Sequence, residues 1–206
     1  NNGGNYANYQ YGTGNTSAAN DAGPHAVTQV NASGTLRYYS YDNNGNLIQE
    51  AWGSPNSVKR ATIWTADNLL QSISQDDTTT TFAYGPDRGR YKQHFVDSCV
   101  SSGGCNPTCT YPTTTTLYVG GSFERIWRAQ TGLFEYRHFI RAGGAMVAIH
   151  AEWGYGVATT TGVQDHYLHL DHLGSVVALS KIVNNAVQVL DRLSYDAWGK
   201  RRPTTW

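Results

Sequence analysis

The sequence predicts an all-β protein made of repeated β-hairpins. Three observations carry this prediction: a short turn pattern that recurs along the chain, alternating segments bounded by turn residues, and a composition rich in Gly, Tyr, Thr and Asn. Hairpins that cannot each bury a face alone must stack on their neighbours. The repeat therefore indicates an extended β-sheet rather than a compact catalytic domain.

The turn pattern is clearest at Tyr41–Leu47 and again at Tyr195–Arg201. Each copy reads as a strand that ends in an aromatic residue, then a carboxylate, two turn residues, a glycine and a second strand. Tyrosine favours a pleated surface, aspartate accepts hydrogen bonds from turn amides, and glycine supplies the positive φ of a tight reversal. A looser copy lies at Tyr84–Tyr91 and a degenerate one at Trp64–Leu69. The residues that we expect to form these structural turns are Tyr41, Asp42, Gly45, Tyr84, Asp87, Gly89, Asp171, Gly174, Tyr195, Asp196 and Gly199.

The predicted elements follow one another along the chain. Residues 1–25 are rich in Asn, Gly, Tyr and Ala with little alternation, so we expect an irregular lead-in there. From 26 to 206 short β segments recur at roughly twenty-residue spacing. Two insertions at hairpin tips, near 97–112 and 154–162, interrupt this repeat segment. The expected strands are 36–41, 61–65, 80–84, 91–96, 114–119, 123–127, 134–140, 145–150, 165–170, 176–180 and 186–194.

No segment predicts a long helix. Val176–Val189 is the most ambiguous stretch, and Asn184-Asn185 divides it as a hairpin turn would. The chain begins Asn1-Asn2 without a methionine or a hydrophobic signal region, and it stops just after a hairpin pattern. We therefore expect a fragment of a longer polypeptide.

Composition and charge exclude several classes of function. Fifteen basic and fifteen acidic residues cancel, so nothing indicates binding to nucleic acid or to an anionic membrane surface. No apolar run reaches about 18 residues, so no membrane-spanning helix is predicted. Only 15% of the residues are charged, against roughly 25% in an average soluble protein. The excess of Tyr, Trp, Gly, Thr and Asn is typical of secreted or cell-surface β proteins.

The three cysteines, Cys99, Cys105 and Cys109, lie close together in one expected insertion. An odd number leaves at least one thiol unpaired within the chain. Zinc would need a fourth ligand, and the spacing matches no familiar zinc-binding pair. We therefore expect a surface loop with one local disulfide or none.

Asp165–His172 is the stretch that most suggests a metal site, because it holds three histidines and two carboxylates. On a straight strand the three imidazoles cannot converge, since His166 and His172 face away from His169. A pair of His169 and Asp171 could bind a metal with help from elsewhere. Alternatively, Asp171 caps the following turn and His169 hydrogen-bonds a neighbouring strand. We favour the second interpretation and expect no metal.

Catalytic and cofactor motifs are not evident elsewhere in the sequence. Gly174-Ser175 lacks the second glycine of a nucleophile elbow. Asp76-Asp77 reads as an exposed turn rather than an acid–base pair. Lys200–Arg202 reads as a solvated turn or as a salt-bridge partner for the next repeat. No glycine pair is followed by a helix that could cradle a phosphate. We therefore expect no catalytic residue and no cofactor.

Several stretches together resemble the Rhs/YD-repeat family. The resemblance rests above all on His169–Val176 followed by Tyr195–Gly199, and it extends from about residue 23 to residue 202. It rests on the combined order of the motifs, since any single Tyr-Asp turn is common. The other stretches that resemble the late part of the family's core are Gly23–Val27, Phe82–Asp87 and Leu117–Gly121.

The resemblance implies a β-sheet strip that spirals into a hollow YD-repeat shell. In bacterial members of the family this shell encloses a polymorphic C-terminal toxin, and in the animal teneurins a related shell forms part of an adhesion receptor. Bacterial members commonly end the core with a self-cleaving Asp-Pro-x-Gly segment. This sequence has no such segment, so no catalytic residue carries over.

Two functions remain open at this point. In the first, the chain is a non-catalytic segment of an Rhs-type shell that encloses and helps deliver a C-terminal toxin in interbacterial competition. Its partners would be the remaining YD repeats of the same polypeptide and the enclosed toxin. In the second, it is an extracellular adhesion or assembly module whose aromatics (Tyr6, Tyr9, Tyr11, Trp153 or Tyr155) bind a partner. Either function predicts a secreted or cell-surface protein whose open sheet edges favour self-association.

Overall fold

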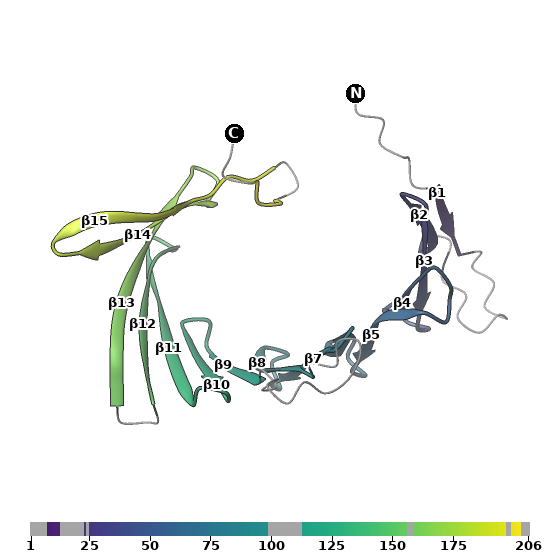
Figure 1. Ribbon diagram of the computed structural model, residues 1–206, viewed down its shortest axis with the longest axis horizontal. Coiled ribbons are helices and arrows are strands. Elements are labelled where there is room, and N and C mark those ends of the chain that lie inside the picture. Colours follow the sequence, from purple (N-terminus) through teal and green to yellow (C-terminus); the bar gives the residue numbers. More distant parts are fainter. Residues whose placement is uncertain are drawn as a thin grey trace. The chain divides into compact units, whose positions relative to one another are not determined.

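The computed structural model describes residues 8–12, 23, 25–98, 113–155, 159–196 and 199–202. All regular structure in these ranges is β-strand, which confirms the predicted all-β fold (Figure 1). The chain divides into two compact units, Asn1–Thr113 and Thr114–Trp206. Within each unit the strand order is the sequence order and neighbouring strands are antiparallel, so the fold is a succession of hairpins.

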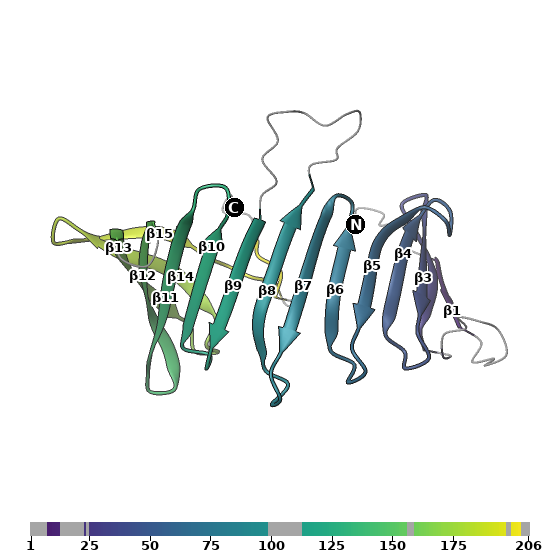
Figure 2. The same cartoon turned by 90° about the horizontal axis from the view of Figure 1, so that it is seen from below.

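The first unit consists of a row of strands, each antiparallel to the next. Figure 2 shows β3 to β8 of this unit side by side. The strands predicted at 36–41, 61–65, 80–84 and 91–96 correspond to β3, β5, β7 and β8. The strands of the unit are β1 (Asn8–Tyr11), β2 (Val27–Ala32), β3 (Thr35–Tyr41), β4 (Leu47–Trp52), β5 (Val58–Trp64), β6 (Leu70–Gln75), β7 (Thr78–Tyr84) and β8 (Arg90–Asp97).

The expected strands do not include β1, β2, β4 or β6, and β1 lies within residues 1–25, where an irregular lead-in was expected. The β4 sequence LIQEAW and the β6 sequence LQSISQ place polar residues on both faces of the sheet. Their strand conformation follows instead from pairing, because each forms a ladder with the strand before it and the strand after it.

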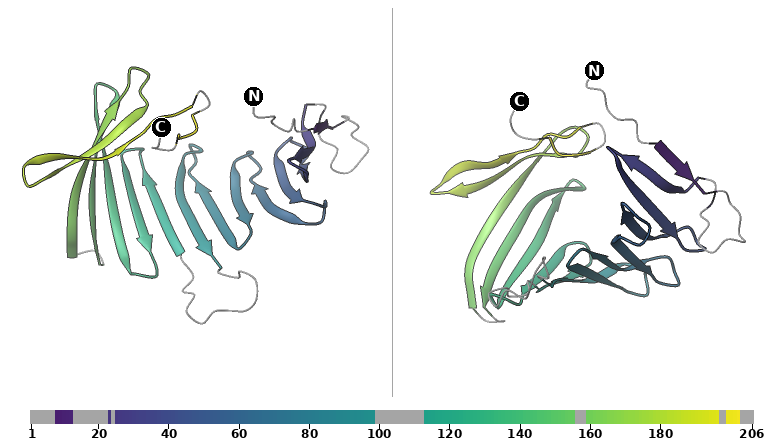
Figure 3. Two further views of the ribbon diagram at one scale, coloured as in Figure 1. Left: turned by 45° about the horizontal axis from the view of Figure 1, so that its top comes forward. Right: turned by 45° about the vertical axis from the view of Figure 1, so that its right-hand side comes forward.

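The second unit continues the same pattern. Its longest strands, β11, β12 and β13, lie side by side (Figure 3). Asn184 and Asn185 form the turn between the last two strands, both with positive φ. The strands of the unit are β9 (Thr113–Val119), β10 (Phe123–Arg128), β11 (Leu133–Ala142), β12 (Ala145–Tyr155), β13 (Thr159–Leu170), β14 (Val176–Val183) and β15 (Ala186–Arg192).

Most of the irregular tip expected at 154–162 is strand. β12 runs to Tyr155 and β13 starts at Thr159, while residues 156–158 lie outside the described ranges. Neither glycine at the bounds of this expected insertion forms a turn, because Gly154 is buried beside a bulge and Gly162 pairs with Trp153. A Cβ at Gly162 would overlap the Trp153 indole, so this glycine marks a close packing contact rather than a turn.

The sheet has little core. Among the described residues no large side chain is fully buried, and the buried apolar residues are Val30, Ala51, Ile126, Ala148 and Ala151. Most side chains are therefore half-buried by lateral contacts on their own sheet, and both faces retain exposed apolar residues.

Candidate functional site

Five turns share one backbone geometry. The amide of the first residue donates to the carbonyl of the fifth, and the amide of the fourth donates to the carbonyl of the first, with N···O distances between 2.8 and 3.1 Å. In four of them the strand before the turn shifts register at its last residue, as a β-bulge does. We number the turns 1 to 5; they are Asp42–Asn46, Thr65–Leu69, Gly85–Gly89, Asp171–Ser175 and Asp196–Lys200.

The fourth residue of every turn has a left-handed backbone. Gly45, Gly174 and Gly199 have φ of 83°, 85° and 80°. In turn 2 the position is taken by Asn68 with φ 57°, since asparagine tolerates this region. In turn 3 it is taken by Arg88 with φ 63°. The sequence pattern had suggested Gly89 as the turn glycine there, but Gly89 is the fifth residue.

In four of these five turns the side chain of the first residue accepts a hydrogen bond from within the turn. Oδ1 of Asp42, Asp171 and Asp196 accepts from the amide of the fifth residue at 2.8 to 2.9 Å. In turn 2 the hydroxyl of Thr65 accepts from Leu69 at 3.1 Å. Turn 3 begins with a glycine, and Oδ1 of its third residue, Asp87, accepts from the fifth amide at 3.0 Å. In turn 3 the acceptor therefore belongs to the third residue instead of the first, while the donor is still the amide of the fifth residue.

These hydrogen bonds lower the pKa of two of the turn carboxyl groups. The Asn46 side-chain amide, helped by backbone amides, holds the pKa of Asp42 below its usual value of 3.8. The Ser175 backbone amide has the same effect on the pKa of Asp171. Both carboxylates therefore stay ionised as turn acceptors at neutral pH.

The aromatic residue before each of the first three turns reaches back to the preceding hairpin. Tyr41 Oη donates to the Val27 carbonyl at 2.8 Å, and Tyr84 Oη donates to the Leu70 carbonyl at 2.8 Å. Trp64 Nε1 donates to the Leu47 carbonyl at 2.8 Å. Each acceptor is the first residue of an even-numbered strand. We call these three hydrogen bonds rungs and the series a ladder. Each rung joins one repeat to the repeat before it.

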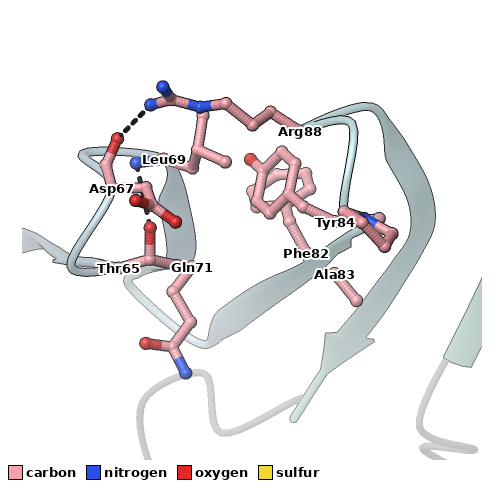
Figure 4. A pocket seen from close by; sticks show the side chains of 10 residues that line it. Thr65, Asp67, Leu69, Gln71, Phe82, Ala83, Tyr84 and Arg88 are labelled. Carbon is pink, nitrogen blue, oxygen red and sulfur yellow. Dashed lines mark hydrogen bonds between the residues drawn. The ribbon is translucent and has the colours of Figure 1, made fainter.

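The turns of the first unit also contact one another. Nδ2 of Asn44 and Nδ2 of Asn46 donate to Oδ1 of Asn68 at 3.0 and 2.9 Å, which joins turn 1 to turn 2. Arg88 donates from a guanidinium nitrogen to the carbonyl of Asp67 at 2.5 Å, which joins turn 2 to turn 3 (Figure 4). The sequence places polar turn residues at the edge of the sheet, and the structure connects them from repeat to repeat.

A buried carboxylate lies on the face that carries the rungs. Glu50 accepts from Trp52 Nε1 at 2.8 Å and forms ion pairs with Arg60 at 3.3 Å and Arg37 at 3.9 Å. The Arg37 guanidinium also lies 4.8 Å over the Trp52 ring. The cluster spans β3, β4 and β5, so it adds a second set of contacts between neighbouring hairpins.

In the second unit, aromatic and histidine side chains line one face of β10 to β13. Phe123 stacks near Tyr136 at 6.2 Å between ring centroids, and near His138 at 4.9 Å. His150 bonds through Nδ1 to Asp165 at 2.6 Å and through Nε2 to Glu152. The bond to Asp165, followed by the bond to Glu152, raises the pKa of His150 above its usual 6.5. Sequence motifs did not reveal this cluster, because pairing register assembles it from separate strands.

The remaining sequence candidates do not converge. His169 Nε2 lies 2.8 Å from Ser180 Oγ on the neighbouring strand β14, and Asp171 accepts hydrogen bonds within turn 4. Tyr195 pairs with Arg201 across turn 5. Within the described residues no set of three His, Cys, Asp or Glu side chains is arranged as metal ligands, and no helix could cross a membrane. Cys99, Cys105 and Cys109 lie outside the described ranges, as does Tyr6.

Comparison with known proteins identifies a shared fold. No family model and no curated protein matches the sequence. The crystal structure of TcdB2-TccC3 without its hypervariable C-terminal region matches with a TM-score of 0.52 and 14% identity, over 81% of this chain and 10% of that one. The crystal structure of TcdB2-TccC3 matches with the same score and identity, over 89% and 11%. The chain thus spans about a tenth of the length of these structures.

Proposed function

We propose that this chain is a non-catalytic structural segment of an Rhs/YD-repeat β-shell that encloses and helps deliver a C-terminal toxin in interbacterial competition. The observation that carries the proposal is the repetition of one turn geometry along the edge of the sheet. Five turns repeat one geometry, and three aromatic rungs tie successive hairpins together. The wall of a shell needs such contacts between neighbouring hairpins, because each repeat must keep a fixed position relative to the repeat before it without a hydrophobic core beneath it.

The exposed faces of the sheet support the same role. A single layer with few buried side chains is poorly suited to catalysis, which needs groups held by surrounding packing. It is well suited to enclosure, because one layer covers the largest area for a given length of chain. Lateral ties such as the Glu50 cluster provide the stiffness that a second layer would otherwise give.

The fold match supports a toxin-associated role. TcdB2-TccC3, as its name states, has a hypervariable C-terminal region, and the resemblance to Rhs cores implies a variable toxin after the repeats. We propose that further repeats of the same polypeptide pair with β15. Turn 5 supports this, because it places Arg201 opposite Tyr195 and lets the Arg202 amide donate to the Ser194 carbonyl at 2.8 Å. A secreted or cell-surface location follows from the proposal.

The test is the intact mass and C-terminal sequence of the native polypeptide that contains this segment. A cleaved C-terminal fragment that stays associated with the core supports the shell. A single uncleaved chain that ends near Trp206, with no associated fragment, contradicts it.

Exposed aromatic residues favour one alternative, an extracellular adhesion or assembly module. Tyr9, Tyr11 and Tyr155 are each more than half exposed, whereas Trp153 packs over Gly162. Under this alternative, replacing the three tyrosines with serine should abolish binding of the purified protein to cells. Under the shell proposal it should have no such effect.

A further inference from the structure

A cavity of about 280 Å³ lies on the aromatic face of the second unit, where β9, β10 and β11 run side by side (Figure 2). Pairing register builds it from two rows of residues that lie directly opposite one another on neighbouring strands. One row is Thr115, Trp127 and Phe134, and the other is Leu117 and Arg125. We call this cavity the β10 pocket.

The charge of Arg125 is not neutralised by the protein. Among the described residues that line the pocket, Arg125 alone is charged, and its side chain is exposed. Within the described part of the chain its guanidinium takes part in no hydrogen bond or ion pair. Arg128 and Arg137 project from the opposite face, where they form ion pairs with Glu135 at 2.7 and 2.6 Å. The alternation of side chains thus separates Arg125 from the carboxylates that neutralise the neighbouring arginines.

The guanidinium lies beside an apolar surface. Its central carbon is 5.7 Å from the centroid of the Phe134 ring, a cation–π contact that restrains the side chain and leaves its N–H donors free. The Trp127 ring lies next to Phe134, with 6.4 Å between the centroids. Leu117 pairs with Arg125 from β9. The pocket therefore offers a fork of hydrogen-bond donors at the side of two aromatic rings.

We propose that the β10 pocket binds an aromatic monocarboxylate. The carboxylate accepts two parallel hydrogen bonds from Arg125, because a guanidinium matches the geometry of a carboxylate. The ring of the ligand packs against Trp127 and Phe134 in offset or edge-to-face contacts. A small number of polar groups beside aromatic side chains is the usual design of a small-ligand site. A free aromatic acid and the C-terminal residue of a peptide that ends in an aromatic residue both carry this chemistry.

Charge and size favour this ligand over others. An ammonium ligand would be repelled by Arg125, and an inorganic anion would make no use of the rings. The phosphates of a nucleotide carry more charge than one arginine neutralises. The volume is just below the roughly 300–1,000 Å³ typical of ligand pockets, which suits one ring with a short acidic arm. The site goes beyond the shell proposal, and its failure would leave that proposal untouched.

The test is a ¹H–¹⁵N NMR titration of the full chain with two probes: 3-phenylpropionate as the free acid, and the peptide acetyl-Ala-Ala-Phe with a free C-terminal carboxyl group. At least one should give saturable shifts confined to β9, β10 and β11, with a dissociation constant in about the millimolar range. Arg125→Gln should weaken binding at least about tenfold by removing the charged donor. Phe134→Leu should weaken it independently by removing an aromatic ring.

Two controls isolate the contribution of charge. Arg141→Gln makes the same substitution at an exposed position of β11 outside the pocket lining, and it should bind as the parent chain does. The amides of the two probes keep the ring and lose the charge, so they should bind the parent chain at least about tenfold more weakly. This comparison needs no variant, so it tests the proposal even if Phe134→Leu does not fold.

The outcomes are distinct. Saturable binding of either acid that is lost in Arg125→Gln and in the amide, but kept in Arg141→Gln, supports the pocket. The probe that binds then shows whether a free acid or a peptide end fits it. Absent or scattered shifts, equal binding of acid and amide, or equal binding by Arg125→Gln and Arg141→Gln would each overturn the proposal.

Discussion

The rung formed by Tyr84 offers a direct test of how neighbouring repeats hold together. Tyr84→Phe removes a 2.8 Å hydrogen bond from the phenol to the Leu70 carbonyl and leaves the ring in place. The bond is partly buried, so its loss should destabilise the fold by about 1 kcal/mol. For a chain of this length that corresponds to a fall in melting temperature of about 2–4 °C.

Urea and thermal unfolding, followed by circular dichroism, measure this difference. Tyr41→Phe, at the equivalent rung, should show the same loss, and the two losses should add because the rungs share no partner. Tyr39→Phe is the matched control, since the Tyr39 hydroxyl forms no hydrogen bond within the described residues. If all three variants were equally stable, the ladder would contribute nothing to cohesion and our reasoning would be refuted.

Three further predictions address packing, turn geometry and pH. Gly162→Ala should destabilise the second unit by about 1–3 kcal/mol in urea unfolding, because the new methyl overlaps the Trp153 indole. Gly45→Val should cost about 1–2 kcal/mol in the same assay through left-handed strain, and Gly45→Asn clearly less. Hydrogen bonds to Asp165 and to a second carboxylate raise the pKa of His150 in the folded state. The protonated imidazole therefore stabilises the fold fully below the pKa that His150 has in the unfolded chain. This stabilisation is lost as the pH rises through the pKa of His150 in the folded protein. His150→Gln should therefore destabilise most in mild acid and least in alkali.

Each of these has an outcome that contradicts it. Val163→Ala, at the neighbouring exposed position, should be nearly neutral, so an equal effect would remove the packing argument for Gly162. Equal stability of the Val and Asn variants at residue 45 would exclude backbone strain. A stability difference between parent and His150→Gln that does not change with pH would show that the imidazole contributes only as a neutral group.

The turns could be predicted from the sequence where they carry the usual residue types. An aromatic, an aspartate and a glycine three residues later identify turn 1 and turn 5, because each residue type meets one local demand. Turn 2 was visible only as a degenerate copy, since Thr65 replaces the carboxylate and Asn68 replaces the glycine.

The roles of the residues in turn 3 could not be predicted from its local sequence. Asp87 and Gly89 are both turn-type residues, so the sequence pattern suggested that they play the roles of aspartate and glycine. The backbone instead requires Arg88 to adopt positive φ, which non-glycine residues rarely do. Hydrogen bonding by Asp87 and pairing of β7 with β8 hold the turn in this state, and neither can be seen in a short motif.

The histidine cluster was missed for a related reason. Motif analysis concentrated on His166, His169 and His172, which are close in sequence but divided between two faces and a turn. His150 and Asp165 are fifteen residues apart and meet because β12 and β13 place them directly opposite each other. Counting outward from the β12–β13 connection could have paired them, but only with the register already known.

The order of strands has a consequence for how the protein is made. Within each unit every described strand pairs with the strands next to it in sequence, so the backbone pairing of these strands does not wait for a distant segment of chain. Such local pairing lowers the loop-closure entropy of folding and permits rapid acquisition of structure. A hairpin can therefore add to the growing edge as soon as it leaves the ribosome. Synthesis and folding can proceed in the same direction, one repeat at a time.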